Sequence, residues 1–137
     1  MNVVVDTNIL YSILLGKNNT FINILMFRED ISFYYPRFAI VELFKYKEKI
    51  VKYSNLKENK LFETFHELLQ KLRFYDEQMI SKQNIRTAYE LCVEIDIKDA
   101  PFIALTFELQ AKLWTGDQFL MLGLQRKGID IFFNPYH

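Results

Sequence analysis

Apolar residues recur along the chain with two different spacings, one typical of β-strands and the other of α-helices. Short runs rich in β-branched and aromatic residues predict buried strands, and apolar positions repeating every three or four residues predict amphipathic helices. The predicted strands are residues 2–5, 31–35, 73–75, 112–114 and 130–133. The predicted helices are residues 7–15, 21–27, 38–53, 56–72, 81–94, 101–110 and 118–127.

The order of these elements predicts the fold class. Strands separated by helices imply parallel crossover connections, and therefore a three-layer α/β/α domain with a central, mainly parallel sheet. The 137 residues suit one domain, residues 1–137, because no repeat, low-complexity tract or linker divides the chain. The helices predicted between residues 38 and 72 crowd together, so we expect one lobe to be wholly helical.

Composition narrows the functional classes. Lysine plus arginine equals aspartate plus glutamate, 17 of each, so any nucleic acid must be held by a local basic face. The single cysteine, Cys92, excludes an internal disulfide and a cysteine-based zinc cluster. The chain shows neither the pattern of a signal peptide nor an apolar run of membrane-spanning length. We therefore expect a cytoplasmic protein without membrane contact.

Four acidic residues stand where predicted strands end or predicted helices begin. Asp6 and Asp117 follow strands, and Glu42 and Asp99 lie at or near the start of helices. In a parallel α/β sheet these ends share one edge, where ligands bind. Clustered carboxylates repel one another unless a cation is present, and Mg²⁺ prefers oxygen ligands. The pattern thus predicts a divalent metal site suited to phosphodiester hydrolysis by water.

Each acid also has an ordinary structural explanation. Asp99 alone would be interpreted as a helix N-cap, and Asp117 alone as a turn residue. Glu42, on the apolar side of its predicted helix, and Asp6, directly after a strand, are harder to explain as solvated charges. The metal-site hypothesis therefore depends on the four acids together.

These residues resemble the motifs of the PIN domain, a nuclease fold found in many VapC-type toxins. The resemblance covers the whole chain and lies in Asp6 of VVVDTNIL, Glu42 of IVELF, Asp99 of DAPFIAL and Asp117 of LWTGDQF, in that order. It implies a metal-dependent ribonuclease with these four catalytic acids. It also implies a Mg²⁺ or Mn²⁺ cofactor held by Asp6, Asp99 and Asp117.

One departure concerns a second metal ion. Some relatives carry another acid just beyond the last aspartate, but Gln118 and Phe119 follow Asp117 here. Asp96, one helical turn before Asp99, is a candidate outer ligand, although a structural loop role is its alternative explanation.

Three further residues are expected to support the acids. In similar proteins the hydroxyl groups next to the first acid and before the last acid support the site, and Thr7 and Thr115 occupy those places. We expect Asn8 to brace the acidic edge by hydrogen bonds.

Basic residues near Glu42 are candidates for RNA binding. Lys45, Lys49 and Arg37 could guide a phosphate backbone toward the metal, or they could simply form a solvated face. The resemblance also implies a small antitoxin partner. The apolar stripes of residues 38–72 are the expected surface for that antitoxin and for a homodimer, with core packing as the alternative use.

Two other functions remain open at this point. A PIN-like module could bind RNA or protein as a scaffold without catalysis, although the four intact acids disfavour it. A DNA nuclease related to flap endonucleases is disfavoured because such enzymes usually carry large additional segments.

Overall fold

The computed structural model describes residues 1–137 and is built on a four-stranded, fully parallel sheet. The strands lie in the order β3-β2-β1-β4. Central strand β1 pairs with both β2 and β4, so that Val4 lies opposite Tyr34 on one side and Leu113 on the other. The strand bounds are β1 (Asn2–Val5), β2 (Ser32–Pro36), β3 (Leu72–Tyr75) and β4 (Lys112–Trp114).

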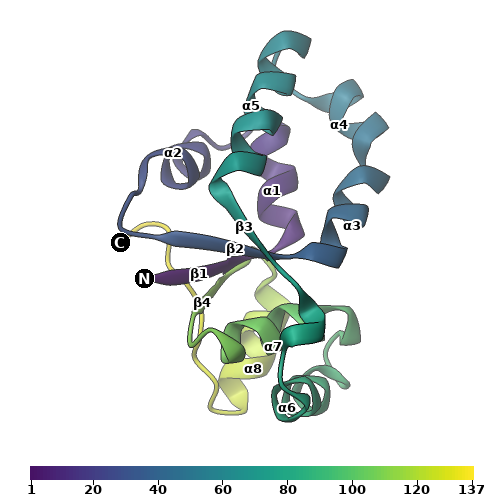
Figure 1. The fold of residues 1–137 in the computed structure, drawn as a ribbon, viewed down its shortest axis with the longest axis vertical. Helices are drawn as coiled ribbons and strands as arrows, with labels where there is room; N and C mark the ends of the chain where they lie inside the picture. The colour runs from purple at the N-terminus through teal and green to yellow at the C-terminus, as the bar shows by residue number, and fades with distance from the viewer.

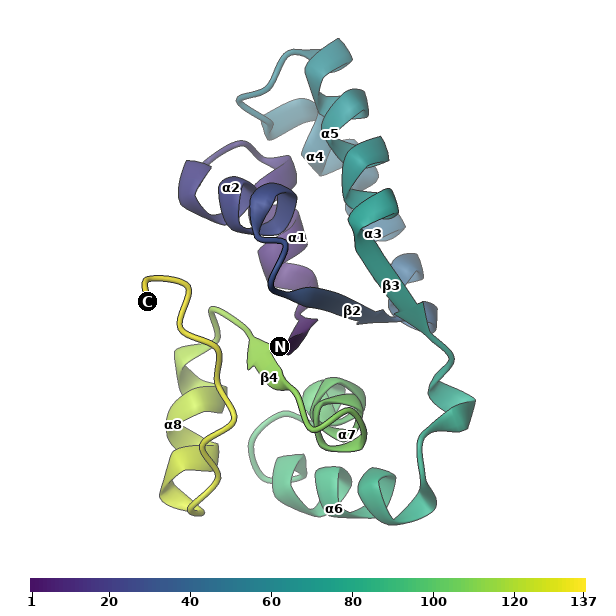
Figure 2. The ribbon, with the colours of Figure 1, turned by 60° about the vertical axis from the view of Figure 1, so that its left-hand side comes forward.

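Helices cover both faces of the sheet, which confirms the predicted three-layer α/β/α fold (Figure 1). Figure 2 shows α1 to α5 on one side of the sheet and α6, α7 and α8 on the other. None of the helices is both long and apolar enough to span a membrane. The helix bounds are α1 (Thr7–Leu14), α2 (Asn19–Phe27), α3 (Ile40–Lys45), α4 (Lys47–Tyr53), α5 (Glu58–Lys71), α6 (Lys82–Cys92), α7 (Ala100–Glu108) and α8 (Gln118–Arg126), with 3₁₀ turns η1 (Arg37–Ala39), η2 (Glu77–Met79) and η3 (Ile97–Asp99).

The core explains why β1 consists of valines after its first residue, Asn2. Val3, Val4 and Val5 have no exposed surface, because helices cover both faces of β1. Beside them, Trp114 packs edge-on against Phe21 with ring centroids 5.3 Å apart. Cys92 is also buried, as expected of a small hydrophobic residue.

The prediction of one continuous helix over residues 38–53 is wrong, because this segment is divided into η1, α3 and α4. The break between α3 and α4 lies at Tyr46, whose backbone angles are φ −93° and ψ 5°. Leu43 and Ile50 are both buried, whereas Val41 and Phe44, which the pattern placed on the same inner face, are exposed. Across the break, α3 buries Leu43 and α4 buries Ile50.

The predicted last strand, residues 130–133, is reduced to a single parallel bridge between Leu113 and Phe132. The Leu113 N–H donates to the Ile131 carbonyl at 2.7 Å, and the Phe133 N–H donates to the Leu113 carbonyl at 2.8 Å. Strand β4 has three residues, so it offers the returning chain little backbone to pair with.

Gly128 directs this return. It ends α8 with φ +81°, and the next N–H, that of Ile129, donates back to the Leu124 carbonyl at 3.0 Å. A left-handed residue in this position is the common end of a helix and favours glycine.

Gly128→Ala should lower the free energy of unfolding by about 1 kcal/mol, because an alanine side chain disfavours the left-handed backbone. Gly116→Ala is the matched control, since Gly116 has no positive φ and a Cβ there would meet no atom within 4 Å. Urea unfolding of both variants measures the difference. Equal stabilities would show that the turn relaxes without strain.

Candidate active site

The carboxyl ends of β1 and β4 bring Asp6 and Asp117 to one edge of the sheet. The Asp6 N–H donates to the Trp114 carbonyl at 2.9 Å, which extends the strand pairing by one residue. Thr115 Oγ1 then donates to Asp6 Oδ2 at 2.7 Å, and Thr115 Oγ1 itself accepts the Asp117 N–H at 3.1 Å. A single buried hydroxyl thus connects the two aspartates, at the place predicted for a supporting threonine.

Asp117 also has a structural role, as the N-cap of α8 and not as the turn residue that its position suggested. Its Oδ1 accepts the Leu120 N–H at 3.0 Å and caps the N-terminus of α8. The cap uses one carboxylate oxygen, so the structural role and a ligand role are compatible at this residue.

A second threonine holds Glu42. Thr7 Oγ1 donates to Glu42 Oε2 at 2.9 Å and lies 2.6 Å from the Tyr35 hydroxyl. Tyr35 also donates to the Ala39 carbonyl at 3.0 Å, so its proton is shared between Thr7 and Ala39. This chain of hydrogen bonds fixes Glu42, at the start of α3, to the end of β2.

Tyr35 was not among the residues expected at this site. It has no exposed surface, and burial raises the pKa of its hydroxyl. The sequence did contain a signal for its role. Tyr35 is the last aromatic residue of β2, faces inward and stands directly before Pro36. A buried tyrosine hydroxyl at such a position needs a hydrogen-bond partner.

Asp99 does not cap its helix, so that ordinary explanation is wrong. Its backbone already has helical angles, φ −81° and ψ −14°, because η3 continues directly into α7, and its side chain makes no capping bond. Asp96 provides the cap instead, with Oδ1 accepting the Lys98 N–H at 3.0 Å. The Asp99 carboxylate is thereby left free, and its Oδ2 is buried without a hydrogen-bond partner.

The charges of the four acids interact at this edge. Burial raises the pKa of Asp99 to about 7, and repulsion from Asp6, Asp96, Asp117 and Glu42 adds to the shift. The four predicted acids therefore lie near enough for their charges to interact, with Asp96 as a further negative charge. Their roles in catalysis and metal binding stay predictions.

The pKa of Asp6 is also raised. Burial is the main cause, and the hydrogen bond from Thr115 opposes this increase. The N–H groups of Thr7 and Asn8 oppose it further, although neither makes a capping hydrogen bond of normal geometry. Asn8 has an exposed side chain, and it acts on Asp6 through its backbone N–H.

Two further predictions for this region concern the metal ligands and the basic residues. No three histidine, cysteine or carboxylate side chains are arranged as a ready ligand set for a metal ion. Among the basic candidates, Arg37 is paired with Asp76 at 3.1 Å, whereas Lys45 and Lys49 are exposed on α3 and α4.

Comparison with known sequences identifies the family. Residues 4–131 match the sequence profile described as a PIN domain. The chain belongs to the PIN domain family. This confirms the resemblance based on the four acidic motifs, and the PIN domain extends over nearly the whole chain. No curated protein matches the sequence.

A solved structure supports the same fold. This PIN domain is similar to a chain in the crystal structure of VapBC2 from Rickettsia felis bound to a DNA fragment from their promoter. The TM-score is 0.61 with 16% sequence identity, and the match covers 96% of each chain. At this identity the similarity establishes the fold alone.

The buried acids should make the metal-free PIN domain less stable as the pH rises. The pKa of Asp99 is about 7 in the folded state and about 4 in the unfolded state, so the folded state binds the proton more tightly. Stability from this group is therefore lost between about pH 4 and pH 7. Asp99→Asn should raise the free energy of unfolding by roughly 1–3 kcal/mol at pH 8 and leave it nearly unchanged at pH 4.

Chemical unfolding in EDTA at several pH values measures this dependence. Asp130→Asn is the control, because Asp130 is an exposed aspartate after α8. Equal effects of the two substitutions at every pH would contradict the strain attributed to Asp99.

Proposed function

We propose that this PIN domain is a metal-dependent endoribonuclease and the toxin of a toxin–antitoxin pair. The observation that carries the proposal is the half-buried Asp99 carboxylate, whose Oδ2 is fully buried without a hydrogen-bond partner and whose charge is repelled by the other acids. Such a carboxylate does not stabilise the fold, because an unpaired charge out of contact with water lowers the free energy of unfolding. A divalent cation would compensate it.

The donor set fits Mg²⁺ or Mn²⁺. Asp6, Asp99 and Asp117 would hold the ion through oxygen atoms, which both ions prefer as ligands. Mg²⁺ keeps several of its waters, so a few carboxylates suffice and a complete protein cage is not required. When bound, such an ion lowers the pKa of a water and stabilises charge on a phosphoryl oxygen.

The other residues of the edge would position these acids. Thr115 fixes the orientation of the Asp6 carboxylate, and Thr7 together with Tyr35 fixes Glu42. Glu42 would act beside the ion, by orienting a water or an outer ligand. Asp96, already used as a cap, would contribute its negative charge from one turn away.

RNA with unpaired bases is the proposed substrate. Single-stranded and loop RNA can be splayed toward a shallow edge, whereas the grooves of a duplex restrict access. Lys45 and Lys49 are exposed and close in sequence to Glu42, and they are the proposed phosphate contacts. Arg37 would have to exchange its ion pair with Asp76 for a phosphate. Because the net charge is zero, we expect modest, salt-sensitive binding.

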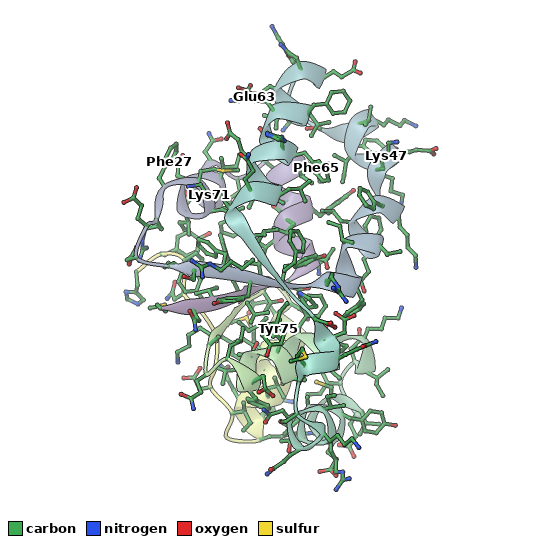
Figure 3. The ribbon with its side chains drawn as sticks, in the orientation of Figure 1. Phe27, Lys47, Glu63, Phe65, Lys71 and Tyr75 are labelled. Carbon is green, nitrogen blue, oxygen red and sulfur yellow. The ribbon has the colours of Figure 1, made fainter.

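An antitoxin partner is proposed from the fold and from an apolar groove. The similar Rickettsia felis structure is VapBC2, and this similarity motivates the proposal of a partner without showing one for this chain. Here α3, α4 and α5 enclose a groove of about 170 Å³ lined almost entirely by apolar residues. Figure 3 shows Phe65 between α5 and α3, where its ring lies 6.3 Å from that of Phe44.

This groove lies within residues 38–72, the surface expected to hold an antitoxin. A hydrophobic segment would fill it, and a basic side chain beyond that segment would pair with the acidic edge. A guanidinium matches a carboxylate through two hydrogen bonds.

A scaffold module without catalysis is the second candidate. The absence of a ready ligand set at the acidic edge favours it. Binding of RNA or protein without metal-dependent cleavage would then be the function of the same surface.

Mg²⁺ or Mn²⁺ should raise the melting temperature of the wild type by mass action and support cleavage of single-stranded RNA. Asp6→Asn should reduce cleavage at least about 100-fold, reduce the metal-induced shift, and leave the metal-free protein as stable or slightly more stable. Thermal melts with and without metal, followed by an RNA cleavage assay, measure all three effects.

Asp130→Asn again serves as the exposed control. Collapse of Asp6→Asn in the metal-free melt would assign Asp6 a purely structural role. Metal binding without cleavage of any RNA in a diverse panel would favour the scaffold function.

Expression of this PIN domain alone should slow bacterial growth, because an unrestrained ribonuclease degrades cellular RNA. Asp99→Ala should remove the effect at an equal protein level, measured by growth curves and immunoblotting. Harmless wild-type expression with nuclease activity in the lysate would indicate an RNA-processing enzyme and contradict the toxin role.

A further inference from the structure

We propose that a pocket at the carboxyl end of β4 binds one base of the RNA substrate, beside the acidic edge. The inference rests on the proposed ribonuclease and adds to it a subsite for a nucleobase. The acids would hold the metal ion and the phosphate that is cut, and the pocket would hold the base of an adjoining nucleotide.

The position of the pocket relates it to the acids. It has a volume of about 510 Å³ and is lined by residues of α2, of α8 and of the C-terminal segment. Figure 2 shows that segment, in yellow, returning past α8 toward α2. Thr115 and Gly116 also line the pocket, and they form the turn between β4 and Asp117. Because Thr115 donates to Asp6 at 2.7 Å, one residue belongs both to the pocket and to the acidic edge.

Aromatic rings form part of the pocket wall. The ring centroid of Phe21 lies 5.3 Å from that of Trp114 and 6.4 Å from that of Tyr136, and all three residues line the pocket. Tyr136 is 72% exposed, and its N–H donates to Asn134 Oδ1 at 2.9 Å, which holds the turn that carries it. An exposed aromatic ring beside a pocket provides a surface on which a base can stack.

The remaining lining residues suit a neutral, polar ligand. Gln118, Met121 and Gln125 line the pocket at spacings of three and four residues, so they share one face of α8. Amide side chains both donate and accept hydrogen bonds, as the edge of a base does. Asp130 is the only charged lining residue, and because it is exposed to water we assign it no part in binding. Without a lysine or arginine the pocket favours a base over a phosphate group.

An unpaired buried donor also points to a ligand. Two buried side-chain polar atoms lack a hydrogen-bond partner, namely Asp99 Oδ2 and Trp114 Nε1. Trp114 is 1% exposed and forms part of the pocket wall. Buried donors are nearly always paired in folded proteins, so an orphaned indole N–H calls for an explanation. The ring nitrogens and carbonyl groups of bases are acceptors of the required kind.

The fluorescence of Trp114 provides the test, because this residue is the only tryptophan of the chain. The full chain in EDTA is titrated with adenosine, guanosine, cytidine and uridine, with correction for their absorbance. Ribose 5-phosphate is the control that lacks a base. At least one nucleoside should change the fluorescence saturably, and ribose 5-phosphate should not. Asp6→Asn should bind nucleosides as the wild type does, since the titration requires neither metal nor cleavage.

Tyr136→Ala should weaken nucleoside binding at least about fivefold, because the base loses its stacking surface, whereas Tyr136→Phe should retain binding. Tyr89→Ala is the matched control, at a tyrosine that is 50% exposed on α6 and lies outside the pocket. Circular dichroism checks the fold of each variant. If Tyr136→Ala does not fold, Gln125→Ala replaces it and should weaken binding through the loss of its amide group.

Cleavage kinetics then connect the pocket with RNA. With Mg²⁺ and single-stranded RNA, Tyr136→Ala should raise KM at least about fivefold and leave kcat nearly unchanged, because the ring binds substrate without entering the chemical step.

Three outcomes separate the alternatives. Wild-type cleavage without nucleoside binding would overturn the base subsite and leave the ribonuclease standing. Loss of nucleoside binding in Tyr136→Ala with an unchanged KM would assign the pocket to a free nucleoside or nucleotide and overturn its role in RNA binding. Nucleoside binding without cleavage of any RNA would support the base pocket and count against the ribonuclease, so the two failures are distinguishable.

Discussion

The hydrogen bond from Thr115 to Asp6 is the contact on which the acidic edge depends. It forms because β1 and β4 are neighbouring parallel strands that end at the same level, so that residues far apart in sequence meet directly after their strands. The bond orients the first carboxylate and also, through the Asp117 N–H, the turn that starts α8. A buried hydroxyl at this point thus connects sheet topology with the placement of two acids. The equivalent link on the other side runs from Thr7 to Glu42 and is completed by Tyr35.

The same arrangement makes the edge electrostatically costly. Burial and mutual repulsion raise the pKa values of Asp6 and Asp99, and the hydrogen bonds present compensate Asp6 better than Asp99. Functional sites often retain such destabilising groups, which the rest of the fold must offset. Here the offset comes from the fully buried valines of β1 and the aromatic cluster around Trp114.

A net charge of zero does not make the surface uniform. The four acids concentrate negative charge at one edge, whereas α6 separates positive and negative residues along its length. The apolar residues are distributed in a similarly local way, with one group lining the groove of α3 to α5 and another, Ile85, Tyr89 and Val93, exposed on α6. Local patterns of this kind determine which partners a surface can bind. The net charge and the mean hydropathy of the chain do not reveal them, because both are averages over the whole chain.

The sequence alone determined the fold class, the order of the elements and the four acids. Strand–helix alternation restricts the topology strongly, and carboxylates after strands or before helices must reach one edge of a parallel sheet. Sequence could not show that the helix of residues 38–53 breaks at Tyr46, because no glycine or proline in this segment marks the break. Neither could it show that the last predicted strand pairs at one bridge, since the extent of pairing depends on its neighbour.

Only the tertiary structure decided the roles of Tyr35, Asp96 and Asp99. The partner of a buried hydroxyl comes from another strand end, and Asp96 takes the cap because η3 runs into α7 without a break. Similarly, Ile85 and Tyr89 of α6 are exposed, whereas Ala88 and Cys92 of the same helix are fully buried. Periodicity identifies an apolar face, but the positions of neighbouring elements decide which part of that face is buried and which part remains free for a partner.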